Sequence, residues 1–145
     1  MSSLTVGTIN VSQRPMFYAQ PSSSASFTTD LTTITQWQVN LNVGNGSFSS
    51  GVYTIPEAGY YKIELSMMKY STSGDFGVYL NKNNTQVQRL VYTSGNWAQG
   101  AGSCILDCAV NDELKCTINT GGATVQIYGG TTAASVGNWT IYKLG

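Results

Sequence analysis

The amino-acid sequence predicts an all-β fold, either a sandwich or a barrel, and three observations lead to this prediction. Short runs of Val, Ile, Tyr and Thr recur between turns rich in Gly, Ser, Thr and Asn, enough for about eight to ten strands. Residues 60–70 alternate apolar and polar side chains at the two-residue period of a strand. No stretch carries the apolar stripe of a long helix. At 145 residues, the chain has the size of one domain.

The first predicted element is an extended arm. Residues 4–11 alternate apolar and polar side chains and end before an Arg-Pro pair. We therefore assign residues 1–15 to an N-terminal arm and residues 16–145 to a single domain. Arms of this kind usually dock on another surface or fray. The candidate docking residues are Leu4, Val6, Ile9 and Val11.

The middle of the chain predicts a strand, a turn and a longer strand. Residues 51–55 lead into the turn at 56–59, where Pro56 presets one dihedral angle and Gly59 can adopt the positive one. We expect this turn to be the corner of a hairpin. In the long strand that follows, the side chains expected in the core are Tyr61, Ile63, Leu65 and Met67.

A second hairpin is predicted directly afterwards. Residues 75–80 form one strand, residues 81–85 a polar turn, and residues 86–92 the returning strand. The chain closes with strands expected at 124–128 and 136–144. The inward side chains of the first strand of the hairpin are Phe76, Val78 and Leu80.

Three cysteines fall in a further hairpin, predicted between residues 103–109 and 113–119. Their spacing, C-x3-C-x7-C, is neither a redox CxxC pair nor a paired zinc signature. A two-residue loop would put Cys108 and Cys116 on opposite faces, whereas a five-residue loop would put all three thiols in the core. We favour the second register, because it also buries neighbouring leucines, and expect free, buried thiols at Cys104, Cys108 and Cys116.

Charge and composition exclude several classes of function. Seven basic residues balance seven acidic ones, and charged residues make up 10% of the chain, against about 25% in an average domain. Scattered single cations cannot neutralise a row of phosphates or an anionic membrane, so we expect no nucleic-acid partner and no membrane insertion. Because the chain has no His, it lacks the commonest general base and zinc ligand.

The carboxylates do not form a recognisable catalytic or metal-binding motif. A glycosidase needs two carboxylates held about 5 to 10 Å apart, and nothing in the sequence fixes such a pair. No D-x-D-x-D run is present either. We therefore expect no enzymatic activity, no metal and no cofactor. The residues interpreted as solvated turn carboxylates are Asp30, Glu57, Asp75, Asp107, Asp112 and Glu113.

Several motifs resemble the C1q-like domains of the complement and tumour necrosis factor superfamily. Residues 42–48 contribute Asn, Gly and Phe of a small loop, and residues 50–63 resemble the G-x-[FY]-T, proline turn and G-x-Y-x-F series. Residues 108–114 resemble the L-x-x-G-D-x-V turn, with Asn111 in place of glycine, a change that Asn tolerates because it adopts left-handed angles. Residues 138–142 resemble the last strand, with Ile141 in place of a small residue.

The resemblance implies a ten-stranded antiparallel jelly roll of two sheets that forms a tight threefold homotrimer through one sheet edge and its aromatic residues. Strand alternation independently places four tyrosines on non-core faces, and exposed aromatics in such number are typical of an interface. The alternative is that they are ordinary surface tyrosines of a monomer. The candidate interface residues are Tyr60, Tyr79, Tyr128 and Tyr142.

A glycine-rich stretch at residues 95–102 is a candidate ligand loop. It lacks the Lys and the following helix of a phosphate loop, and it presents a Trp among amide side chains. Such a Trp is suited to stacking on a sugar ring, so a host-surface glycan is a candidate partner; packing on a neighbouring loop or subunit is the alternative. The candidate residues are Asn96, Trp97 and Gln99.

A neutral, Ser/Thr/Asn/Gln-rich C1q-like head behind a short arm is similar to virion proteins of tailed bacteriophages. The leading hypothesis is a trimeric capsid decoration or cement protein, assembled in the host cytoplasm and displayed on the virion surface, with the arm docked on another virion protein. The first alternative is the receptor-binding tip of a tail or head fibre. The second is a bacterial or secreted C1q-like adhesion module.

Overall fold

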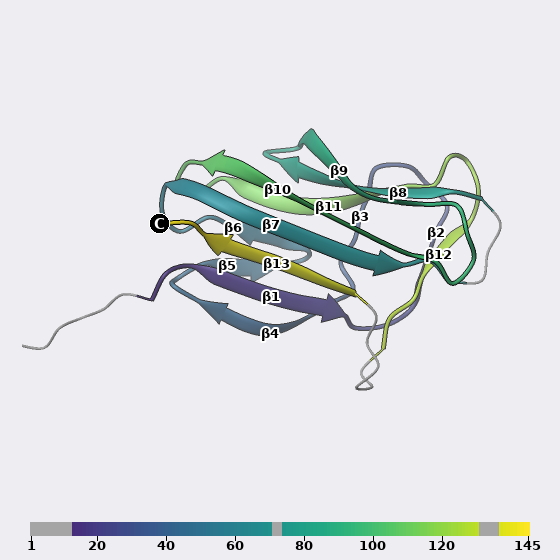
Figure 1. The fold of residues 1–145 in the computed structure, drawn as a ribbon, viewed down its shortest axis with the longest axis horizontal. Helices are drawn as coiled ribbons and strands as arrows, with labels where there is room; N and C mark the ends of the chain where they lie inside the picture. Colours follow the sequence, from purple (N-terminus) through teal and green to yellow (C-terminus); the bar gives the residue numbers. More distant parts are fainter. Residues whose placement is uncertain (1–12, 71–73, 131–136) are drawn as a thin grey trace, which may run out of the picture.

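The computed structural model describes residues 13–70, 74–130 and 137–145, and the regular secondary structure in these ranges is β-strand (Figure 1). The candidate docking residues Leu4, Val6, Ile9 and Val11 lie outside the described residues. The strands are β1 (Met16–Pro21), β2 (Ala25–Phe27), β3 (Thr32–Thr33), β4 (Trp37–Val43), β5 (Ser47–Ser49), β6 (Val52–Thr54), β7 (Gly59–Met68), β8 (Phe76–Lys82), β9 (Thr85–Thr93), β10 (Gln99–Cys108), β11 (Glu113–Asn119), β12 (Val125–Ile127) and β13 (Gly137–Lys143).

The strands form an antiparallel two-sheet jelly-roll sandwich. A five-stranded sheet has the order β10-β7-β13-β1-β4, and a six-stranded sheet has the order β5-β6-β11-β8-β9, with β3 also paired to β11. A small ladder joins β2 and β12. The start of β1 and the C-terminus lie at the same end of the sandwich (Figure 1). The predicted fold class is therefore confirmed.

Alternation along the central strands builds the core. The four side chains of β7 predicted to face inward are at most 1% exposed, and the same holds for the three of β8. Each such side chain contributes about 1.5 to 3 kcal/mol when it leaves water. The confirmed residues are Tyr61, Ile63, Leu65, Met67, Phe76, Val78 and Leu80.

An aromatic cluster fills one part of the core. The Phe17 ring lies 5.0 Å from that of Tyr53 and 5.4 Å from that of Trp139, and Trp37 lies 5.3 Å from Trp139. Within the described residues, the Tyr53 hydroxyl and the Trp139 indole nitrogen are buried without a hydrogen-bond partner. Shape and apolar contact therefore hold Tyr53 and Trp139 in place, whereas the indole of Trp37 also donates to the Ile34 carbonyl oxygen at 3.0 Å.

Two predicted hairpin corners are wrong, because the chain changes sheet at both. β6 belongs to the six-stranded sheet and β7 to the five-stranded one, so the turn at 56–59 crosses between sheets. Likewise β10 pairs with β7 while β11 pairs with β8, so residues 103–109 and 113–119 are not neighbours in one sheet. The two corners bond to each other instead: Ile55 N donates to Asp112 O and Asn111 N donates to Ile55 O, both at 2.8 Å.

The prediction of buried free thiols is confirmed for Cys108 and Cys116, and Cys104 is free but only partly buried, although the predicted hairpin is absent. All three cysteines are free; Cys116 and Cys108 are buried, and half-buried Cys104 packs against the core. Alternate side chains of β10 and β11 face the core, so Cys104 and Cys108 approach it from the five-stranded sheet and Cys116 approaches it from the six-stranded sheet. Burial raises the pKa of Cys108 to about 11 and also raises the pKa of Cys104, so both stay protonated near neutrality.

Asparagine shapes two of the turns. Asn111 has φ 70°, the left-handed conformation expected where the resembled motif has glycine. The predicted β8–β9 hairpin is confirmed, and its turn carries Asn83 and Asn84 at φ 50° and 65°. Two successive positive φ angles are what a tight two-residue hairpin requires.

Glycines allow β10 to cross close to β9 where the two sheets meet. A Cβ atom on Gly102 would lie 2.1 Å from the carbonyl oxygen of Leu90, and one on Gly100 would lie 2.7 Å from Cγ1 of Val91. No side chain fits at either distance, so glycine is needed for the strands to approach. This contact closes one long edge of the sandwich, and we call it the glycine seam.

Candidate functional site

The outer face of the five-stranded sheet carries a continuous row with apolar side chains. Strand register aligns five outward side chains across the whole sheet: Val43, Met16, Tyr142, Lys62 and Ile105, on β4, β1, β13, β7 and β10. Ile105 is 60% exposed and Met16 is 40% exposed. Apart from the Lys62 ammonium, the row exposes mostly apolar surface.

Two further exposed side chains widen this row. Tyr60 lies opposite Asp107 of β10 and is 60% exposed, and Leu41 lies opposite Tyr18 of β1. Exposed large apolar side chains gathered on one sheet face are unusual for a surface that stays in water. We call the surface formed by Met16, Leu41, Tyr60, Ile105 and Tyr142 the assembly face.

The charges on the assembly face largely neutralise each other. Lys62 and Glu64 stand two positions apart on β7, and Nζ of Lys62 lies 3.3 Å from Oε1 of Glu64. The hydrogen bond that Lys62 donates to Glu64 raises the pKa of Lys62, and the neighbouring Tyr142 adds to the effect. An exposed pair contributes little stability. Its effect is to pair the two charges of β7, while the exposed Asp107 carboxylate, opposite Tyr60, adds one acidic group on β10.

Small side chains hollow the same face beside the ion pair. A shallow depression of about 400 Å³ lies over β7, β10 and β13. Ser66, Ala101 and Gly102 line it, so the backbone of the sheet is accessible there. The assembly face therefore combines projecting apolar side chains with a recess that a neighbouring side chain could enter.

The four tyrosines proposed for the interface lie on three different surfaces. Tyr60 and Tyr142 belong to the assembly face. Tyr79 projects from the outer face of the six-stranded sheet, and Tyr128 directly follows β12, where its ring lies beside those of Tyr70 and Trp97. Alternation identified the outward positions, but it could not assign strands to sheets. It also passed over Ile105, which stands between two inward side chains of β10 and was detectable as an outward apolar position.

The candidate ligand loop belongs to a second cluster of aromatic residues. Trp97 is 53% exposed, and its ring meets that of Tyr70 edge-on at 4.6 Å. Tyr70 stacks on Tyr128 at 5.6 Å with an interplanar angle of 15°. We call Tyr70, Trp97 and Tyr128 the aromatic platform. Asn96 is exposed in the same turn, whereas Gln99 begins β10 opposite Met68.

Backbone geometry marks Trp97 as well. Its φ is 57°, a left-handed value that is rare for a bulky side chain. Strain of this kind persists only where surrounding contacts impose it, and it gathers at functional sites. The ring contacts with Tyr70 and Tyr128 are such contacts.

Two of the turn carboxylates, Asp30 and Asp112, make structural hydrogen bonds. Backbone and hydroxyl donors of Thr120 lower the pKa of Asp30, with distances of 2.6 and 2.9 Å. Asn83 and the Ala109 N–H lower the pKa of Asp112. Within the described residues, no three His, Cys, Asp or Glu side chains are grouped to hold a metal ion. Over the same ranges, no helix is long and apolar enough to span a membrane.

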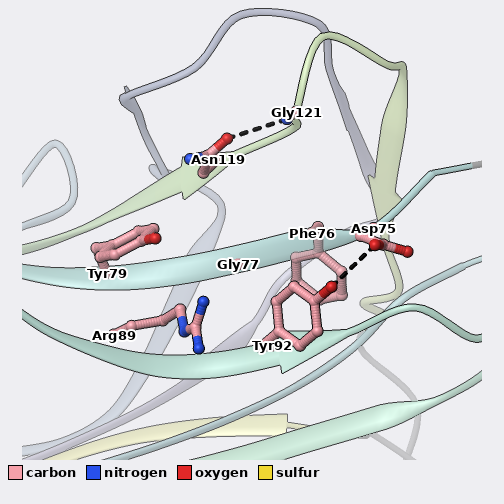
Figure 2. A pocket seen from close by; sticks show the side chains of 8 residues that line it. All are labelled: Asp75, Phe76, Gly77, Tyr79, Arg89, Tyr92, Asn119 and Gly121. Carbon is pink, nitrogen blue, oxygen red and sulfur yellow. Dashed lines mark hydrogen bonds between the residues drawn. The ribbon is translucent and has the colours of Figure 1, made fainter.

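A separate pocket of about 220 Å³ opens on the outer face of the six-stranded sheet (Figure 2). We call it the Arg89 pocket. The guanidinium of Arg89 lies 4.9 Å from the centre of the Tyr92 ring, and the Tyr92 hydroxyl donates to Oδ2 of Asp75 at 2.8 Å. That hydrogen bond raises the pKa of Tyr92 and keeps the phenol protonated. Sequence reasoning did not find this pocket, because its residues come from strands whose pairing local patterns do not reveal.

Comparison with solved structures identifies the fold. The structure of murine APRIL at pH 8.0 is similar with a TM-score of 0.70 and 12% identity, over 91% of this chain and 100% of that chain. PRD1 vertex protein P5 is similar with a TM-score of 0.69 and 18% identity, over 91% of this chain and 98% of that one. The globular domain of zebrafish complement 1qA protein is similar with a TM-score of 0.62 and 10% identity, over 91% and 98%.

The sequence matches no protein-family model and no curated protein sequence. The similarity to known proteins therefore rests on solved structures, and at identities of 10 to 18% these show the fold alone. The chain has a jelly-roll fold like those of C1q and tumour necrosis factor domains, as the sequence motifs predicted.

Proposed function

We propose that this chain is a non-enzymatic virion surface protein that works as a homotrimer, in the role of a capsid decoration or cement protein. The observation that carries the proposal is the assembly face, a surface of exposed apolar side chains on one sheet of a jelly roll. A likeness in fold to the phage vertex protein P5 supports a place on a virus particle.

The assembly face has the properties of a permanent subunit contact. Interface cores are depleted in charge and enriched in aromatic residues and Met. The face offers Met16, Tyr60 and Tyr142, and Lys62 and Glu64 are already paired with each other. Burying Ile105 against a second copy of the chain removes exposed apolar surface, provided that Asp107 on the edge strand β10 stays in contact with water. Threefold closure is the arrangement that the C1q-like resemblance implies.

The proposed docking arm precedes β1, which starts at the end of the sandwich where the C-terminus lies (Figure 1). Pro15 is buried, its carbonyl oxygen accepts a hydrogen bond from Lys143 N at 3.0 Å, and β1 starts at the next residue. The domain is therefore anchored from residue 15 onward, and a deletion that spares the fold must stop before it. We propose that residues 1–12 bind a capsid protein while the trimer presents the loop ends outward.

Deleting residues 1–12 tests this role. The truncated chain should remain a folded trimer and should no longer bind particles that lack the protein, as measured by co-sedimentation. A chain with residues 2–12 replaced by a Gly/Ser sequence of equal length is the matched control and should also fail to bind. Full binding by either variant would show that the arm does not dock.

The aromatic platform favours a second candidate, the receptor-binding tip of a fibre. Exposed Trp97, held at a left-handed φ beside two Tyr rings, is suited to stacking on a sugar ring. Copy number separates the candidates: hundreds of copies per particle indicate decoration, and a few trimers indicate a fibre tip. In the second case, Trp97→Ala should abolish adsorption to cells, while Val110→Ala, at an equally exposed position beyond the other end of β10, should not. Absence from particles would leave the adhesion module.

A further inference from the structure

The Arg89 pocket has features of a ligand site and lies apart from both the assembly face and the aromatic platform. Its floor comes from adjacent strands in register: Gly77 of β8 lies opposite Tyr92 of β9 and Asn119 of β11. In the next row Tyr79 lies opposite Arg89. The two outward tyrosine side chains and the guanidinium thus surround a position that has no side chain (Figure 2).

Glycine at position 77 keeps this position open. A Cβ atom there would touch Cδ of Arg89 and Cε2 of Tyr79, both at 3.5 Å, which is ordinary contact distance. The backbone does not force the choice of glycine, because an alanine would fit without a clash. The missing side chain leaves a recess between the guanidinium and the ring.

Hydrogen-bond donors outnumber free acceptors in the pocket. Within the described residues Arg89 makes no ion pair, and its recorded side-chain partner is the Tyr92 ring. Oδ1 of Asn119 accepts from Gly121 N at 3.0 Å, which leaves its amide group to donate. Asp75 is already bonded to the Tyr92 hydroxyl through one oxygen. A ligand that complements these groups carries a negative charge and several hydroxyls.

The size of the pocket limits what it can hold. At about 220 Å³ it is smaller than the roughly 300 to 1,000 Å³ typical of sites for drug-sized molecules. Its lining combines the aromatic residues Tyr79 and Tyr92 with polar groups, which suits a ring that has apolar faces and a polar rim. It also lies on the sheet opposite the assembly face, so burial of that face leaves it open.

We propose that the Arg89 pocket binds a single sugar unit that carries a carboxylate, such as a uronic acid within a surface polysaccharide. The Arg89 fork binds the carboxylate through two parallel hydrogen bonds. The sugar ring lies over Gly77 between Tyr79 and Tyr92, and its hydroxyls reach Asn119 and the second oxygen of Asp75. This site does not depend on whether the chain decorates a capsid or ends a fibre.

A titration of the full chain, followed by protein NMR, tests the assignment with methyl β-D-glucuronide as the probe and methyl β-D-glucoside as its neutral match. The glucuronide should bind at least tenfold more tightly and shift the amide signals of β8, β9 and β11. Arg89→Gln should remove this preference. Gly77→Ala should weaken glucuronide binding about tenfold while the protein keeps its denaturation midpoint. Arg14→Gln, the same charge change outside the pocket, should leave binding unchanged.

Three results would overturn the proposal. The first is equal binding of glucuronide and glucoside, or no binding of either. The second is inorganic phosphate binding as tightly as the glucuronide, which would indicate a simple anion site. The third is glucuronide binding by Arg89→Gln equal to that of the unaltered chain, which would place the sugar elsewhere.

Discussion

The two outer faces of the sandwich use similar neutral residues but treat their polar groups differently. On the five-stranded sheet, apolar side chains project into water and the amide pair Asn40 to Gln20 is exposed. On the six-stranded sheet, Asn81 is buried and donates to the Thr117 hydroxyl at 2.7 Å. One face has its polar groups satisfied within the chain, and the other leaves apolar surface for a partner. Strand alternation alone does not distinguish them.

The largest expected effect is on assembly. Ile105→Asp replaces a highly exposed apolar side chain of the assembly face by a charge, and three copies meet in a trimer, so the trimer should dissociate at least 1,000-fold more readily, about 4 kcal/mol. Light scattering after size exclusion measures this. Leu31→Asp is the matched control, because both side chains are 60% exposed and Leu31 lies outside the assembly face. Equal dissociation of both variants would show that the face has no special role.

The second-largest expected effect is on stability, at the glycine seam where edge strands β9 and β10 of the two sheets meet. Gly102→Ala places a Cβ atom 2.1 Å from the Leu90 carbonyl oxygen, so β9 and β10 must separate. We expect a loss of about 3 kcal/mol in unfolding free energy, measured by chemical denaturation. Gly130→Ala is the control, since a Cβ atom there meets nothing within 4 Å. A cost below about 0.5 kcal/mol at position 102 would contradict the close approach.

The buried amide tests the comparison of the faces directly. Asn81→Ala leaves the Thr117 hydroxyl without its partner and should cost about 1 to 3 kcal/mol. Asn40→Ala removes a side-chain hydrogen bond of similar length, 2.8 Å, in an exposed position, and should cost about 0.5 kcal/mol or less. Thermal and chemical denaturation measure both. Equal costs would mean that the faces do not differ in how their polar groups contribute to stability.

The smallest expected effect is on acid stability. The pKa of Asp30 in the folded protein lies below its ordinary value of 3.8, because Thr120 donates to the carboxylate. Its contribution is therefore complete above that value and is lost as the pH falls through it towards the lowered pKa. Asp30→Asn should flatten the loss of stability below pH 4. A slope identical to that of the unaltered chain would contradict the role of this hydrogen bond.

Local patterns predicted the strands and their buried faces, but not which sheet each strand joins. The alternation of β7 from Tyr61 to Met67 appears in the sequence because one face is buried and the other is not. The corners at 56–59 and 109–112 follow ordinary turn chemistry, so a hairpin and a crossover between sheets look alike there. β4 alternates apolar and amide side chains from Trp37 to Val43, but it is largely exposed on both faces, so its apolar period does not mark a buried face. Because alternation does not show which sheet a strand joins, the sequence prediction grouped Tyr79 and Tyr128 with Tyr60.

The mass of the unaltered protein in solution tests the central claim most directly. If the assembly face joins three copies, light scattering at micromolar concentration should give three times the chain mass of 15.5 kDa, about 46 kDa, and should keep this value on dilution. A mass of 15.5 kDa throughout would contradict the account, because it would leave the exposed row from Met16 to Ile105 without a partner.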